Sequence, residues 1–144
     1  MDIATVTELT ARFRLGICLA RKDLPECMQA FPRGACLDSS VLLAAYLKDK
    51  GCGTFCLLRT QWPVDDIDTH AWLEQDGWII DITADQFPDV ADAVIVTKDR
   101  RWHSRYAPEP PEVADFRERY PGEVDWLHAA YSAILQHIPT SPLP

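Results

Sequence analysis

The sequence predicts a single α+β domain with helical segments at both ends and short strands between them. Apolar residues recur at helical spacing near the start of the chain, follow strand-like patterns over residues 53–97, and return to helical spacing after residue 112. The chain has 144 residues and is 47% apolar, which is enough for one hydrophobic core. We therefore treat residues 1–144 as one domain, with its core at 33–97.

The first helix is expected over residues 3–20. Leu9, Phe13 and Ile17 recur every four residues there, which places them on one face of a helix. Residues 24–32 then contain two prolines and no regular apolar spacing, so they are expected to form the connecting loop.

The second helix is expected over residues 35–50, a segment rich in good apolar helix formers. Gly51 follows at the position where a left-handed residue commonly ends a helix. Cys36 lies in the first turn, where unpaired N–H groups and the positive end of the helix dipole favour a thiolate. Asp38, two residues on, opposes this effect unless its side chain points elsewhere.

A β-hairpin is the most specific local prediction. Asp76-Gly77 is a favoured pair for a two-residue type I′ turn, which sets Gln75 opposite Trp78. The two arms are part of a small antiparallel sheet. The four expected strands cover residues 53–60, 69–75, 78–83 and 93–97.

The hairpin register divides its side chains between two faces. His70 and Asp81 fall on the same face as diagonal cross-strand neighbours, with backbones roughly 7–8 Å apart. A slip of one residue would separate them. Their face is expected to be the polar, functional one, because the opposite face is nearly all apolar. The apolar face carries Ala71, Leu73, Trp78, Ile80 and Ile82.

The C-terminal part is expected to contain helices within residues 112–138. Ala107-Pro-Glu-Pro-Pro111 is a stiff break before them, and Pro121-Gly122 interrupts them. The last helix has one apolar side. That side carries Val124, Leu127, Tyr131, Ile134 and Ile138.

Part of this sequence resembles a known family. His70-Ala71-Trp72-x-Glu74, then Gly77-Trp78, then Asp81-x-Thr83 is similar to the core signature of the transglutaminase-like branch of papain-fold proteins. Gly34-x-Cys36 at the head of an apolar helix is similar to that family's nucleophile segment. The resemblance covers residues 33–83 and implies a helix that carries the cysteine, packed on an antiparallel sheet. By the same resemblance Cys36 is the nucleophile, His70 the base and Asp81 the orienting carboxylate.

The expected function is that of a cysteine-dependent amide hydrolase or acyl-transfer enzyme acting on a peptide or protein. Peptidase, deamidase and transglutaminase activities all fit, because they differ only in the substrate and in the acceptor of the acyl group. Two alternatives stay open. Arg33-Gly34-Ala35-Cys36 resembles a segment of the arylamine acetyltransferases, although the hairpin sequence does not follow theirs, and this resemblance implies a coenzyme A-dependent acyltransferase on a small amine. The other alternative is a catalytically inactive binding module of the same fold.

Other residues are secondary candidates for the site. Gln29 and the backbone N–H of Cys36 could stabilise an oxyanion. Asp85 is the rival of Asp81 if the strand bulges. His103 is the rival of His70, although it has no acid in a similar register. The secondary candidates are Gln29, Trp72, Asp85, Gln86 and His103. The acidic segment 61–68 either borders the substrate cleft or is a solvated connection.

Net charge and composition limit the classes of partner that this chain is expected to bind. A formal net charge of −8 disfavours nucleic acid, and no apolar run is long enough to span a bilayer. The first eight residues lack the pattern of a secretory signal, so a cytoplasmic location is expected, with signal-less export left open. No cofactor motif is present, and thiol chemistry requires none.

The five cysteines are an odd number, which is typical of a reducing compartment. Cys52 and Cys56 are expected to be strand residues of the core. No second pair of cysteines or histidines accompanies them, so a zinc site is not expected there.

Overall fold

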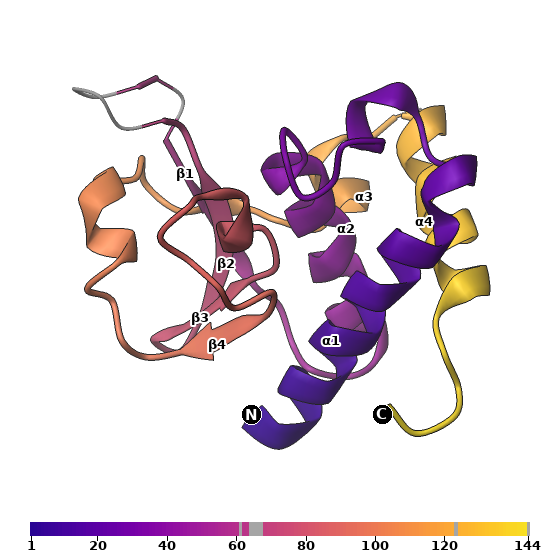
Figure 1. Ribbon diagram of the computed structural model, residues 1–144, viewed down its shortest axis with the longest axis horizontal. Helices are drawn as coiled ribbons and strands as arrows, with labels where there is room; N and C mark the ends of the chain where they lie inside the picture. Colours follow the sequence, from indigo (N-terminus) through magenta and orange to yellow (C-terminus); the bar gives the residue numbers. More distant parts are fainter. Residues whose placement is uncertain (61, 64–67, 123, 144) are drawn as a thin grey trace.

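A computed structural model describes residues 1–60, 62–63, 68–122 and 124–143. Within these residues the chain has a mixed α+β architecture, with the helices packed on one side of an antiparallel sheet (Figure 1). The helices are α1 (Ile3–Ala20), α2 (Cys36–Asp49), α3 (Phe116–Arg119) and α4 (Asp125–His137). The strands are β1 (Cys56–Arg59), β2 (Ala71–Gln75), β3 (Trp78–Asp81), β4 (Ile95–Thr97) and β5 (Glu112–Val113).

Helix α2 is the central helix of the fold. It contacts β1 and β2 of the sheet as well as α1, α3 and α4, and it is buried continuously from Ser39 to Leu47. Its C-terminal end is closed by a Schellman motif, in which Gly51 has φ +82°. The N–H of Cys52 bonds to the carbonyl of Leu47 at 2.9 Å, and that of Gly51 to Lys48 at 3.0 Å. The helix therefore begins and ends close to the predicted residues.

Helices α1 and α4 pack against each other, and both also contact α2 (Figure 1). The Asp2 side chain caps α1 by accepting hydrogen bonds from the N–H groups of Ala4 and Thr5. Gly16 permits the close approach of the two helices, because a Cβ there would lie 2.8 Å from Ile138 and 3.2 Å from the Ile134 carbonyl. Among the described residues, no helix is long and apolar enough to cross a membrane.

The sheet has the strand order β4-β3-β2-β1-β5, and all neighbours are antiparallel. The predicted hairpin joins β2 to β3: Gln75 pairs with Trp78, and both turn residues have positive φ, 52° for Asp76 and 80° for Gly77. The register and turn type are thus confirmed.

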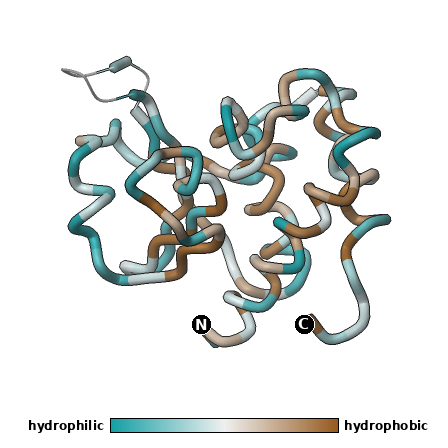
Figure 2. The backbone as a smooth tube through the Cα atoms, in the orientation of Figure 1, coloured by the Kyte–Doolittle hydropathy of each residue, from teal (hydrophilic) through white to brown (hydrophobic). Residues whose placement is uncertain are grey.

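The apolar face of the hairpin contributes to the main core, as predicted. The opposite face was expected to be the polar, functional one, and its polar character is only partly confirmed because apolar side chains bury it. A second, smaller hydrophobic cluster covers it, built from Leu58, Trp72, Ile79 and Tyr106 with Phe87 and Trp102 at its margin. Figure 2 shows hydrophobic residues on the strands themselves and hydrophilic ones along much of the loop that leaves β4.

Two further expectations are corrected. Cys52 lies before β1 rather than within it, and Cys56 is exposed, so these residues are not strand residues of the core. Residues 112–113 form an edge strand instead of a helix, because they pair with β1. Segment 24–32 contains the 3₁₀ turn Glu26–Met28, whose last residue is buried. The acidic segment 61–68 lies largely outside the described residues.

Candidate active site

Cys36 is the first residue of α2, and its side chain is partly accessible. Among the described residues no side chain caps this end of the helix, so its first N–H groups have no side-chain partner there. Asp38 is directed to Cys27, whose thiol lies beside it, and burial raises the pKa of the Asp38 carboxyl. The acid that was expected to oppose a thiolate at Cys36 therefore has a different neighbour.

A surface pocket of about 460 Å³ joins Cys36 to the edge of the sheet. Cys36 and His70 both line it, so a molecule in the pocket would lie next to the thiol and directly over the buried His70. Besides His70, the described lining contains one basic side chain, Arg59, which is engaged by Glu112 at 2.8 Å. The described lining consists of Cys36, Leu37, Arg59, Thr60, Trp62, Thr69, His70 and Ala71.

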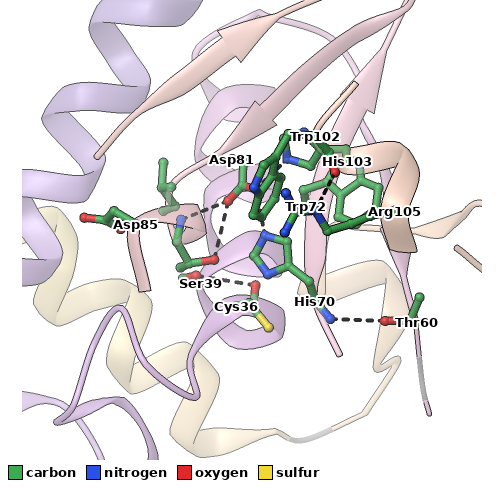
Figure 3. Close-up of polar contacts among 12 residues, drawn as sticks. Cys36, Ser39, Thr60, His70, Trp72, Asp81, Asp85, Trp102, His103 and Arg105 are labelled. Atoms are coloured by element: carbon green, nitrogen blue, oxygen red, sulfur yellow. Dashed lines mark hydrogen bonds and ion pairs between the residues drawn. The ribbon is translucent and has the colours of Figure 1, made fainter. Parts of the chain in front are cut away.

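His70 immediately precedes β2 and is fixed by its backbone. Its N–H donates to Thr60 Oγ1, and its carbonyl accepts from the Thr60 N–H, each at 3.1 Å. The side chain is completely buried, with Nε2 2.7 Å from Asp81 Oδ2. Figure 3 shows the imidazole between the Asp81 carboxylate and Cys36. The two predicted partners therefore lie on either side of the ring.

Three aromatic rings cover the imidazole of His70. Phe87 and Trp102 present their edges, with ring centroids 5.1 and 5.7 Å from that of His70, and Tyr106 is tilted at 5.4 Å. We call Phe87, Trp102 and Tyr106 the aromatic cover. It excludes water from the His70–Asp81 contact and strengthens the hydrogen bond between them.

Burial lowers the pKa of His70, but the contacts with Asp81 and with the Cys36 thiol outweigh it and raise the pKa to about 9. The Nδ1 atom of His70 is buried and has no partner among the described residues that meets hydrogen-bond geometry. Cys36 is therefore a close neighbour of the ring but not a geometrically formed hydrogen-bond partner.

Asp81 ends β3 and is surrounded by donors. Its Oδ1 accepts from the N–H of Thr83 at 2.9 Å, and its Oδ2 accepts from both His70 and His103 at 2.7 Å. Burial alone would raise the pKa of this carboxyl. The hydrogen bonds from His103, His70 and Thr83 outweigh burial and hold the pKa well below its ordinary value.

His103 was expected to lack an acid, and this was wrong. It lies on the short 3₁₀ helix His103–Tyr106, is 3% exposed, and shares Asp81 with His70. Its contact with Asp81 spans 22 residues of chain and crosses from one segment to another. No local spacing in the sequence signals such a contact.

The shared carboxylate fixes the hydrogen positions of both rings. Each Nε2 faces a carboxylate oxygen, so each must carry a proton to donate. In neutral His70 the lone pair is then on Nδ1, the ring nitrogen that is not bound to Asp81. In the protonated ring Nδ1 is a donor. Asp81 thereby selects the form of His70 that can exchange a proton with Cys36.

His70, Asp81 and His103 are also the one group of three among the described residues whose ligand atoms could meet at a metal ion. Two ligands of a tetrahedral zinc lie about 3.3 Å apart, since each bond is about 2.0–2.1 Å. Here both nitrogens lie 2.7 Å from a single oxygen. This spacing is that of hydrogen bonds.

The remaining candidates lie elsewhere. The Gln29 amide donates to the carbonyls of Arg21 and Leu24, away from the pocket. Asp85 forms two hydrogen bonds with Arg14 and is directed away from His70 in Figure 3. Trp72 is buried against the two histidine rings and donates to Glu74 at 3.4 Å.

Gln86, the last secondary candidate, is in the 3₁₀ helix Ala84–Gln86. Its Nε2 atom is buried and has no partner among the described residues, and Gln86 is not in the described pocket lining.

Comparisons of the chain with protein-family models, with curated proteins and with solved structures give no match. The chemistry of the site is therefore interpreted from its geometry.

Proposed function

We propose that this protein is a thiol enzyme that forms an acyl-enzyme on Cys36, with a peptide or protein as its substrate. One observation carries the proposal: Cys36 and His70 line the same open pocket, while the far side of the His70 ring is bound to buried Asp81. A nucleophile, a base and an orienting acid are thereby available in one place.

The first step uses the thiol and imidazole as a pair. A pKa of about 9 keeps His70 protonated at neutral pH, and a cation beside a thiol favours the thiolate. The Sγ atom of Cys36 attacks an amide carbonyl and forms a C–S bond. As the C–N bond breaks, His70 Nδ1–H gives its proton to the leaving amine.

The second step releases the acyl group. His70, now neutral, takes a proton from water or from an amine at Nδ1, and the new nucleophile attacks the thioester carbonyl. The C–S bond breaks and the thiolate returns. Water as acceptor gives hydrolysis or deamidation, whereas an amine gives a new amide bond and hence cross-linking. The oxyanion formed in each step would be stabilised by the backbone N–H of Cys36 at the start of α2.

The pocket supports a peptide or protein substrate. It is open to solvent, and Trp62 in its lining is 73% exposed, so a long chain could lie across the pocket with an apolar side chain on the indole ring. The charged group of Arg59 is already engaged by Glu112, which leaves this part of the pocket suited to an uncharged side chain.

The proposal is tested by acylation with p-nitrophenyl acetate at pH 7, followed by acid quenching, intact mass and peptide mapping. We expect one acetyl group on Cys36 in the wild-type protein, removable by hydroxylamine. Cys36→Ser should abolish the label. Cys56→Ser is the matched control, because Cys56 is an exposed free thiol, and it should acylate like the wild type.

Two results would replace the proposal. Equal labelling of Cys36 and the exposed cysteines would indicate an inactive binding module. Labelling of Cys36 by acetyl-coenzyme A, with none by activated esters or peptide thioesters, would indicate a coenzyme A-dependent acyltransferase. A primary amine added after acylation separates the two acceptor classes, because only a transamidating enzyme converts it to an amide faster than water hydrolyses the thioester.

A further inference from the structure

The Asp81 carboxylate is held by donors from three residues in three places in the fold, and the Thr83 hydroxyl adds a longer bond of 3.5 Å to that of its N–H. The Thr83 N–H binds Oδ1, while His70 and His103 both bind Oδ2. A carboxylate with a single partner can rotate or shift. With three directional bonds, Asp81 can move only by breaking one of them in a site from which water is excluded.

His103 is itself held in place independently of Asp81. Its ring packs on Trp102 and Trp72, with ring centroids 4.7 and 4.9 Å away. Trp102 donates its indole N–H to Asp89 at 2.9 Å, and Arg105 binds the same Asp89 oxygen at 2.9 Å. His103 therefore presents its Nε2 to Asp81 from a segment that has its own anchors.

His103 is not placed to act on the substrate. It does not line the pocket that contains Cys36, and it borders a different surface pocket with Asp92, Asp99 and Arg101. Asp99 in that pocket is paired with Arg101 at 2.6 Å. Among the described residues His103 is hydrogen-bonded to the site through Asp81, and its ring stacks on that of His70 with the centroids 6.3 Å apart.

We propose that His103 is a positioning residue, which fixes the orientation of Asp81 and through it that of His70, in a chain Cys36–His70–Asp81–His103. This inference rests on the proposed thiol chemistry and extends it beyond the three residues that the sequence predicts. The Nε2–H of His103 is a donor whether the ring is neutral or charged, so its contribution requires no change of charge.

The inference is tested with a matched pair of variants, His103→Gln and His103→Met. Both side chains have similar length and flexibility, but only glutamine has an amide N–H that can replace Nε2–H. Loss of an outer hydrogen-bond partner commonly lowers activity by about 10-fold to 100-fold. We expect His103→Met to slow acylation of Cys36 by this factor, and His103→Gln to recover most of the loss.

A purely structural role for His103 predicts a different pattern. In that case both variants would lose activity in parallel with thermal stability, or neither would lose it. The pKa of His70, followed by NMR, separates the roles. In His103→Met, Asp81 loses one of two competing donors and binds His70 more strongly, so the pKa of His70 should rise, whereas in His103→Gln it should stay near the wild-type value. His128→Met is the histidine control, because His128 is exposed on α4. This change should alter neither the acylation rate of Cys36 nor the pKa of His70.

Wild-type protein provides a test that needs no variant to fold. Long-range ¹H–¹⁵N spectra of the histidine side chains should show a proton on Nε2 of both His70 and His103. A proton only on Nδ1 of His103 would overturn the inference, and so would an equimolar metal ion bound by His70, Asp81 and His103 in the purified protein. Failure of the thiol chemistry itself is recognised separately, because Cys36 would then be unlabelled in the wild type while the tautomers stay as described.

Discussion

The Nε2 atom of His70 lies 2.7 Å from Oδ2 of Asp81, and neither side chain is exposed to solvent. The contact crosses the β2–β3 hairpin and depends on its register, since a shift of one residue would move one partner to the opposite sheet face. Because Asp81 binds Nε2, the other ring nitrogen of His70 is left for Cys36. A local turn of two residues thus determines which nitrogen is available for chemistry.

Replacing Asp81 or Asp85 by asparagine should have different effects on the rate of acylation and on the free energy of unfolding. Asp81→Asn removes the charge that orients His70, and acylation of Cys36 should fall by about 10²–10⁴. Asp85→Asn should leave acylation within a few-fold. Asp85 instead pairs with Arg14, whose side chain is 13% exposed, so this change should cost about 1–3 kcal/mol of unfolding free energy.

These two variants are compared by acylation rate and by urea denaturation of the same preparations. If Asp85→Asn abolished acylation while Asp81→Asn did not, the orienting acid would have to be reassigned to Asp85.

Stability should depend on pH through His70. Its pKa rises from 6.5 to about 9 on folding, so the folded state binds this proton more tightly than the unfolded state. The resulting stabilisation is fully present below pH 6.5 and is lost as the pH rises through 9. A difference of this size corresponds to about 3 kcal/mol.

The measurement is urea unfolding of the wild type and of His70→Gln from pH 6 to pH 10. The difference in unfolding free energy between the two proteins should decrease steadily over this range. A difference that did not change with pH would show that the folded and unfolded states bind the His70 proton equally. Below pH 4 both proteins should lose stability, because Asp81 has a lowered pKa and its charge stabilises only the folded state.

Reactivity with a mild alkylating agent should not follow exposure. Cys18, Cys27 and Cys56 are exposed, whereas Cys36 is only partly accessible. At pH 7 iodoacetamide should nevertheless modify Cys36 first, because protonated His70 lies beside its thiol. Peptide mapping at early times measures the order, and His70→Ala should remove the preference. Faster modification of the three exposed thiols in the wild type would contradict activation of Cys36.

The hairpin turn should tolerate asparagine at one position and not alanine at the next. Gly77 has φ +80°, and an added Cβ would meet nothing within 4 Å, so Gly77→Ala carries a conformational cost of about 1 kcal/mol without a clash. Asp76→Asn should be nearly neutral, because asparagine also adopts the left-handed region. Urea denaturation measures both changes. Equal stability of Gly77→Ala and the wild type would contradict the assigned turn type.

Local patterns account for the elements that could be predicted. The boundaries of α1 and α2, the Asp76-Gly77 turn and the pairing of Gln75 with Trp78 all depend on residues close together in sequence. In such cases spacing, caps and turn propensities act within one or two turns of the chain. The placement of His70 and Asp81 on one face follows from the same local register.

Contacts between distant segments could not be predicted in this way. β5 has two residues and is a strand only because β1 offers it an edge. Asp85 is held away from His70 by Arg14, a partner 71 residues away in the sequence. Short segments have too little intrinsic preference to determine their own partners.

The order of α1, α2 and β1–β4, the hairpin register and the meeting of His70 with Asp81 could be derived from local patterns, because each arises from the periodicity of a short stretch of backbone. The dry environment of this sheet face, the pocket that Cys36 shares with His70 and the hydrogen bond of His103 to Asp81 depend on tertiary packing. The physical reason is that burial and buried hydrogen bonds depend on how separate segments pack. The segment after β4 folds back over the sheet, and a polar strand face thereby becomes the interior of a site.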